Sequence, residues 1–230
     1  MECKKLNIAI DGPAGAGKST VARRVANSLG YTYFDTGAMY RALAVLAMER
    51  NVSLDDFESL GALASEVKIE GREDNGVFRV WIDGKEITDK LREPETDRAV
   101  ALLSKATPVR KVLVSMQQQI AKCGGVVMEG RDITSVVMPD AEVKVFLTAD
   151  VNERARRRWQ EQVNKGIDVS FEEVLDDLVK RDAIDLEREW GKLIKVDDAE
   201  VIDSTDLSIE EVCALIINLC KEKQKCSTRL

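Results

Sequence analysis

Residues 12–19, GPAGAGKS, fit the phosphate-binding pattern G-x-x-x-x-G-K-[ST] in full and follow an apolar run at residues 8–10. Glycines at these positions let successive backbone N–H groups converge on phosphate oxygens at a helix N-terminus. In this pattern Lys18 reaches the β- and γ-phosphates, and the Ser19 hydroxyl binds Mg²⁺. The motif therefore predicts a bound nucleoside triphosphate with Mg²⁺, a ligand that enzymes and molecular switches share.

A regulatory GTPase is the main alternative of another class. Such proteins generally carry a D-x-x-G switch and an N-K-x-D guanine-binding motif. No aspartate in this chain has a glycine three residues later, and NKGID at residues 164–168 contains one residue too many. The sequence therefore disfavours a GTPase.

The second candidate group is FDTGAMYR at residues 34–41, which follows a predicted strand. Open α/β sheets bind ligands at the carboxyl ends of their strands, so Asp35, Thr36, Tyr40 and Arg41 are expected at that edge. The structural alternative is that Asp35 or Thr36 caps a helix and Arg41 lies on a solvated helix face.

The third group is VVMEGRDI, in which an apolar run at residues 126–128 precedes Glu129, Arg131 and Asp132. We interpret one carboxylate as a ligand near Mg²⁺ and the arginine as a phosphate ligand. A structural salt bridge is the alternative.

Two predicted helices near the C-terminus supply the fourth group. Arg154, Arg157 and Arg158 share one helix face, and Arg181, Asp185 and Arg188 share a face of the next helix. A charged stripe is usually a solvated face, but arginines at this density repel one another unless an anion joins them. The spacing therefore favours phosphate binding.

Five short apolar segments are the predicted strands that position these residues, and helical patterns separate most of them. This alternation predicts a parallel sheet with helices on both faces. Residues 66–88 differ, because they alternate polar and apolar residues and contain the turn signals Asn75-Gly76 and Asp83-Gly84. We expect a small antiparallel sheet there, followed by helices at 96–106 and 109–122. The predicted strands of the main sheet are residues 6–10, 32–34, 126–128, 143–148 and 200–202.

The composition limits the function further. The 230 residues carry a formal net charge of −7, which disfavours a nucleic-acid polymer as partner. There is no histidine, so catalysis must rely on Lys, Arg, Asp, Glu and a metal ion. The five cysteines show no C-x-x-C spacing, and no apolar run approaches a membrane span. Without a signal-peptide pattern, the sequence predicts a cytoplasmic protein with reduced thiols, and we expect a monomer.

Taken together, IDGPAGAGKST, FDTGAMYR, EGRDI with PDAEVKVFLTAD, and KRDAIDLER resemble the bacterial cytidylate kinase family over nearly the whole chain. The resemblance implies an α/β P-loop NTPase fold of the adenylate-kinase type. Its parallel five-stranded sheet has helices on both faces and a small antiparallel β insertion. It also implies a core formed by residues 1–61, 101–151 and 191–230, a nucleoside-monophosphate-binding insertion at 62–100, and an arginine-rich lid at 152–190.

The resemblance implies Mg²⁺-dependent transfer of the γ-phosphoryl group of ATP to CMP or dCMP. Mg²⁺ would be bound by the Ser19 hydroxyl, with Glu129 or Asp35 acting through water. The implied catalytic residues are Lys18, Arg131, Arg158 and Arg188. Those implied to bind ATP are Gly12, Pro13, Ala14, Gly15, Ala16, Gly17, Lys18, Ser19, Thr20 and Arg157. Those implied to bind CMP are Thr36, Tyr40, Arg41, Arg110, Arg131, Asp132, Arg181, Asp185 and Arg188.

Two departures from the family pattern concern the choice of base. Ala101 stands where the family often has a serine that contacts the base, with Ser104 one helical turn away, and Thr134 stands where glycine is usual. A kinase for UMP, AMP or a metabolite such as shikimate therefore remains an alternative, as does a nucleotide-dependent switch.

Overall fold

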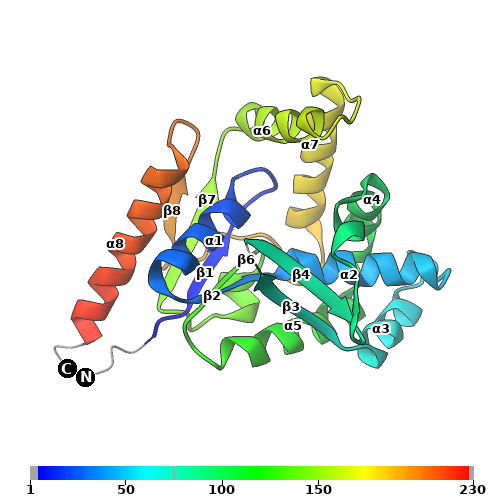
Figure 1. The fold of residues 1–230 in the computed structure, drawn as a ribbon, viewed down its shortest axis with the longest axis horizontal. Coiled ribbons are helices and arrows are strands. Elements are labelled where there is room, and N and C mark those ends of the chain that lie inside the picture. Colours follow the sequence, from blue (N-terminus) through cyan, green and yellow to red (C-terminus); the bar gives the residue numbers. More distant parts are fainter. Residues whose placement is uncertain (1–4, 75, 228–230) are drawn as a thin grey trace.

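The computed structural model describes residues 5–74 and 76–227. Its central sheet is parallel and has the strand order β2-β6-β1-β7-β8 (Figure 1). All five predicted strands are present, although the first begins two residues later than predicted and ends on Asp11. The strands are β1 (Ile8–Asp11), β2 (Thr32–Asp35), β6 (Val126–Gly130), β7 (Val143–Thr148) and β8 (Glu200–Asp203).

Helices cover both faces of this sheet, which is why β1 and β6 are buried along their whole length. On one face, α1 (Lys18–Leu29) packs against α8 (Ile209–Ser227). From β1 the chain crosses to the edge strand β2 and then returns to β6, which lies between them. Because both crossovers are right-handed, this reversal places α2 (Thr36–Glu49) and α5 (Thr107–Ala121) on the face opposite to α1. The short helix α3 (Phe57–Glu66) packs on α5.

The insertion is the predicted antiparallel sheet, formed by β3 (Ile69–Asp74), β4 (Val77–Ile82) and β5 (Lys85–Glu86). At the second predicted turn, Asp83 and Gly84 both have positive φ, as a tight hairpin requires; at the first, Asn75 lies outside the described residues. The Phe78 ring packs edge-on against Tyr33 and Phe34 of β2. The insertion therefore shares the main hydrophobic core.

After the insertion, a 3₁₀ turn, η1 (Thr88–Arg92), leads into α4 (Pro94–Leu103), and α5 begins at Thr107. These two helices match the predicted 96–106 and 109–122 to within two or three residues. A π-helical segment, η2 (Ile133–Val137), follows β6. The predicted insertion boundaries 62 and 100 fall inside α3 and α4, and the division of the chain into core, insertion and lid remains a prediction.

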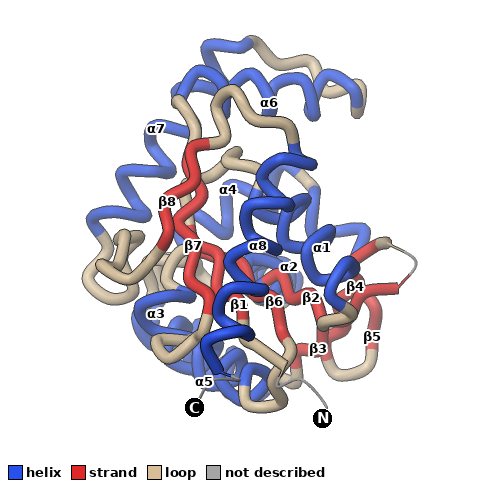
Figure 2. The backbone as a smooth tube through the Cα atoms, turned by 90° about the vertical axis from the view of Figure 1, so that its left-hand side faces the viewer, coloured by secondary structure: helices blue, strands red, loops and turns tan. Residues whose placement is uncertain are grey.

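The predicted lid consists of α6 (Val151–Asn164) and α7 (Phe171–Glu187), which lie beyond the carboxyl edge of the sheet (Figure 2). Ser170 and Glu173 form a capping box that fixes the start of α7. The two helices share a small apolar cluster centred on Ala155, Val174 and Leu178, separate from the main core. Across residues 5–74 and 76–227, no helix has the length and apolar character needed to cross a bilayer.

Candidate active site

A large cleft of about 1560 Å³ opens at the carboxyl edge of the sheet. It exceeds the roughly 300–1,000 Å³ typical of a site for one small molecule. The P-loop, the start of α2, α4, the end of β6 and the two lid helices all contribute to its walls. The predicted residues that line it are Ala14 to Thr20, Asp35, Thr36, Tyr40, Arg41, Arg110, Glu129, Arg131, Asp132, Arg157, Arg158, Arg181 and Arg188, whereas Gly12, Pro13 and Asp185 lie behind this surface.

The P-loop backbone depends on its glycines. A Cβ atom on Gly12 would lie 1.9 Å from the carbonyl oxygen of Leu147, so no other residue fits there without a shift of β7. Gly15 and Gly17 both have positive φ, and Gly17 occupies the N-cap of α1. The Lys18 ammonium donates a hydrogen bond to the Pro13 carbonyl oxygen at 2.7 Å. Burial, followed by the positive charge of Arg131, lowers the pKa of Lys18.

Ser19 and Glu129 form the candidate Mg²⁺ site. The Ser19 hydroxyl donates to Glu129 Oε1 at 2.5 Å, and Glu129 is buried. Burial and the neighbouring Asp35 carboxylate raise the pKa of Glu129. Hydroxyl and carboxylate oxygens are the donors Mg²⁺ prefers, and Mg²⁺ usually takes few protein ligands and completes its shell with substrate phosphate and water. The donors present here therefore fit a Mg²⁺ ion bound together with a triphosphate.

At the start of α2, FDTGAMYR both caps the helix and places polar side chains at the carboxyl edge of the sheet. Asp35 is the N-cap, because its Oδ1 accepts from the backbone N–H of Ala38 at 3.0 Å. Its Oδ2 lies 3.9 Å from Arg41 Nη1 and 3.8 Å from Arg92 Nη2. The Thr36 hydroxyl donates to the Glu129 carbonyl oxygen at 2.7 Å and so ties α2 to β6.

Opposite the P-loop, three arginines surround the single carboxylate of Asp185. Arg131 Nε donates to Asp185 Oδ2 at 2.7 Å, Arg181 Nε lies 3.5 Å from the same oxygen, and Arg188 Nη2 lies 3.2 Å from Oδ1. Asp185 is fully buried, yet the charges of Arg131, Arg181 and Arg188 outweigh the opposing effect of burial and lower its pKa to about 2. Burial and then the charge of Arg110 lower the pKa of Arg188 to about 10.

This cluster has more positive charge than its carboxylate can balance. Within the described part of the chain, Arg181 Nε and both Nε and Nη2 of Arg188 are buried and lack a hydrogen-bond acceptor in good geometry. Buried donors without partners are costly, so the geometry is suited to an anion that would accept from them.

A second buried ion pair lies deeper in the acceptor side of the cleft. Arg110 Nη2 donates to Asp132 Oδ2 at 2.5 Å and to the Gly191 carbonyl oxygen at 3.3 Å. The Arg110 guanidinium also lies over the rings of Tyr40 and Trp190, 5.5 and 5.7 Å from their centroids. The pair is therefore held rigidly and presents a fixed set of polar atoms, as base recognition requires.

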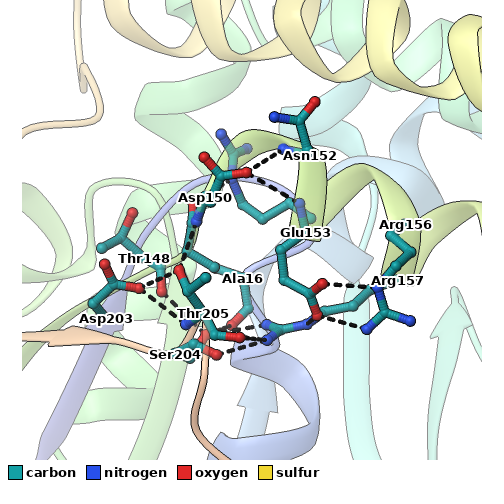
Figure 3. A network of polar contacts seen from close by, with 12 residues as sticks. Ala16, Thr148, Asp150, Asn152, Glu153, Arg156, Arg157, Asp203, Ser204 and Thr205 are labelled. Carbon is teal, nitrogen blue, oxygen red and sulfur yellow. Dashed lines mark hydrogen bonds and ion pairs between the residues drawn. The ribbon is translucent and has the colours of Figure 1, made fainter.

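The lid arginines share a helix but have separate partners within the chain. Arg154 is buried and donates to the P-loop carbonyl of Ala14 at 3.1 Å and to Asp182 Oδ2 at 2.7 Å. Arg157 donates to the Ser204 carbonyl oxygen at 2.6 Å and to Glu153 (Figure 3). The spacing of these arginines predicted that they need a bound anion to offset their mutual repulsion, but carboxylates and carbonyl oxygens of the chain already do so. In addition, Arg154 does not line the cleft.

Two carboxylates that bind partners from distant segments were not singled out by the sequence reasoning. Asp11 ends β1 immediately before the P-loop and accepts hydrogen bonds from Ile133 N, Thr134 N and Thr134 Oγ1 at 2.6–2.8 Å. Burial raises the pKa of Asp11 to about 6. A charged residue ending the apolar run IAID was the available signal. Asp97 of α4 is the second, and no sequence pattern marked it.

Comparison with known proteins gives the family. The cytidylate kinase family profile matches residues 8–222. The cytidylate kinase of Bacillus subtilis (strain 168) is 46% identical over 222 residues, covering 96% of this chain and 99% of the relative. That of Enterococcus faecalis (strain ATCC 700802 / V583) is 47% identical over 219 residues, with 95% and 97% covered. An uncharacterized protein from Eubacterium ventriosum ATCC 27560 shares the fold alone, with a TM-score of 0.50, 14% identity, and coverage of 95% of this chain and 99% of that one. This chain therefore belongs to the cytidylate kinase family.

Proposed function

We propose that this protein is a phosphotransferase that moves the γ-phosphoryl group of ATP to CMP or dCMP and releases ADP and CDP or dCDP. The observation that carries the proposal is the excess of buried positive charge facing the P-loop, where Arg131, Arg181 and Arg188 share one carboxylate. One cleft thus offers a triphosphate site and a separate anion site. Membership of the cytidylate kinase family supports CMP as the acceptor.

The acceptor phosphate needs no general base. Its second pKa is about 6, so at neutral pH an oxygen is largely ionised and ready for in-line attack on the γ-phosphorus. This agrees with a chain that contains no histidine. The N–H groups of Arg181 and Arg188 that lack a hydrogen-bond acceptor in good geometry would orient the acceptor phosphate, and Lys18 would stabilise charge on the transferred group. A Mg²⁺ ion bound by Ser19, with Glu129 or Asp35 acting through water, would neutralise phosphate charge when ATP is present.

The lid would exclude water from the reacting phosphates. Because α6 and the part of α7 around Val174 and Leu178 share an apolar cluster separate from the main core, they would move as a unit with little disturbance of that core. The end of α7 would stay fixed through the ion pair of Asp185 with Arg131. Closure would bring Arg157 and Arg158 over the phosphates and prevent hydrolysis of ATP. We propose residues 62–100 as the acceptor-binding insertion and residues 152–190 as the lid.

The hydroxyl groups near the proposed base pocket are already hydrogen-bonded within the chain. Ala101 lines the cleft without a hydroxyl, and the Ser104 hydroxyl already donates to the Ala101 carbonyl oxygen at 2.9 Å. The Thr134 hydroxyl is likewise committed to Asp11 at 2.6 Å. Base recognition is therefore proposed to rest on Arg110 and Asp132.

Steady-state ADP formation from ATP and Mg²⁺, measured against CMP, dCMP, UMP, AMP, GMP and shikimate, tests the proposal. We expect kcat/KM for CMP and dCMP to exceed the values for all other acceptors. A clear preference for AMP or shikimate would contradict the acceptor assignment. A preference for UMP over CMP would contradict the choice of CMP and the role given to Arg110 and Asp132, but not phosphoryl transfer to a pyrimidine nucleotide.

We further propose a monomer in the cytoplasm. The free thiols of Cys123, Cys213 and Cys220 support a reducing compartment. The exposed large apolar residues are spread over several elements, among them α3, α4, α6, α7 and α8, which supports a monomer.

A further inference from the structure

Another carboxylate of the cleft, that of Asp97, lies between arginines from two different parts of the chain. Asp97 of α4 places Oδ1 3.6 Å from Arg41 Nε and Oδ2 2.5 Å from Arg158 Nη2. Arg41 comes from α2 and Arg158 from lid helix α6, and both line the cleft together with Asp97. Asp97 thus joins α2 on the acceptor side of the site to lid helix α6.

Asp97 differs from Asp185 in its exposure. The Asp97 side chain is 30% exposed and its partners Arg41 and Arg158 are 22% and 25% exposed, whereas Asp185 is fully buried. Ion pairs that water reaches are weak and screened by salt, whereas a fully buried carboxylate among arginines is costly to separate. Asp185 is therefore a fixed part of the cluster, and Asp97 can be displaced.

A phosphate is a strong competitor for the same guanidinium groups. Both carboxylate and phosphate accept charge-assisted bonds from arginine, and a phosphate brings up to two charges and three acceptor oxygens. The family resemblance implies that Arg41 binds CMP, and the proposed function brings Arg158 over the phosphates when the lid closes. Asp97 pairs with both of these arginines in the structure.

We propose that Asp97 is a positioning residue that acts as an internal competitor of the substrate phosphates. This inference rests on the proposed function. Its carboxylate holds Arg41 and Arg158, and with them α6 against α4, until the phosphate of the nucleoside monophosphate takes its place. It therefore weakens acceptor binding and assists release of the product by recapturing the two arginines.

The test compares the full-length wild type with Asp97→Asn, Asp97→Glu and Glu161→Gln by calorimetric titration with CMP. Glu161 is the matched control, because its carboxylate accepts from Arg158 at 2.9 Å within α6 and does not reach α4. We expect Asp97→Asn to lower the Kd for CMP about three- to tenfold at low ionic strength, with a smaller effect at high salt. Asp97→Glu and Glu161→Gln should stay within about twofold of the wild type, because both leave a competing carboxylate at Asp97's position.

Titration with cytidine separates competition from a change in fold. Cytidine lacks the phosphate, so Asp97→Asn should leave its Kd unchanged, and the unfolding midpoint of the variant should match that of the wild type. An unchanged or higher Kd for CMP in folded Asp97→Asn, or an equal gain for cytidine, would overturn the inference.

Turnover of CMP by the same proteins keeps the two proposals apart. If the wild type forms CDP but Asp97→Asn binds CMP no more tightly, only the role of Asp97 fails. If the wild type forms no CDP, the proposed function fails. We expect KM for CMP to fall in Asp97→Asn without an increase in kcat, a split that a purely structural role would not produce.

Discussion

Lys18→Ala is expected to lower kcat with CMP by about 10²- to 10³-fold, the loss typical of removing one group that stabilises transition-state charge. The Lys18 ammonium lies in the P-loop and donates to the Pro13 carbonyl oxygen, whereas Arg131, the cation whose charge lowers the pKa of Lys18, lies on the acceptor side. We therefore expect no other side chain to replace Lys18 at the γ-phosphate.

The same substitution should not destabilise the fold. Burial lowers the pKa of Lys18, so its charge is held in the folded state at a cost in free energy. Alanine removes that cost, and the unfolding midpoint in urea should be equal or higher. Lys165→Ala is the control, because Lys165 forms an exposed ion pair with Glu161, and its removal should leave kcat nearly unchanged. Near-normal turnover by folded Lys18→Ala would contradict the role assigned to this lysine.

Asp185→Asn is expected to cost about 3 to 5 kcal/mol of folding free energy, the range found when one partner of a buried ion pair is removed. The neutral amide would leave Arg131, Arg181 and Arg188 without their shared carboxylate in a buried position. Urea unfolding at pH 7 measures the loss. Asp198→Asn is the control, because Asp198 pairs with Lys144 at the surface and should change the midpoint little.

The difference between wild type and Asp185→Asn should depend on pH in one direction. The folded-state pKa of Asp185 is about 2, below its ordinary value of 3.8. The ionised carboxylate therefore stabilises the fold fully above about pH 4 to 5, and that contribution disappears as the pH falls from about 4 towards about 2. The difference in unfolding free energy between the two proteins should narrow over this range, by about 2 kcal/mol for a pKa that falls from 3.8 to about 2 on folding. A difference that stays constant down to about pH 2 would show that charge is not what Asp185 contributes.

Local patterns predicted the elements and the P-loop because those depend on neighbouring residues. The glycine spacing predicted the loop between β1 and α1, and the polar residues after the apolar run at 126–128 predicted that Glu129 and Arg131 lie at the carboxyl edge of the sheet, where both line the cleft. The prediction failed at contacts between distant segments. Helical spacing places Arg154 and Arg157 on one face, but it does not reveal that Asp182 and Ser204 bind them.

Asp97 and Asp11 were missed for the same reason. Asp97 is an ordinary acidic residue in the first turn of α4, and only the approach of α2 and α6 gives it two arginine partners. Asp11, which directly precedes the P-loop, accepts a hydrogen bond from the start of η2 because β1 and β6 pair in register. Thr134 stands where the family usually has glycine, and its hydroxyl donates a further hydrogen bond to Asp11.

Transfer of the terminal phosphoryl group between two nucleotides in one cleft is the central claim, and isotope labelling tests it most directly. ATP labelled at the γ-phosphate is incubated with the protein, Mg²⁺ and CMP, and the products are separated. We predict that the label appears in CDP in a one-to-one ratio with ADP and that almost none appears as inorganic phosphate. Label released as inorganic phosphate at a rate independent of CMP would contradict the account and indicate a hydrolytic switch.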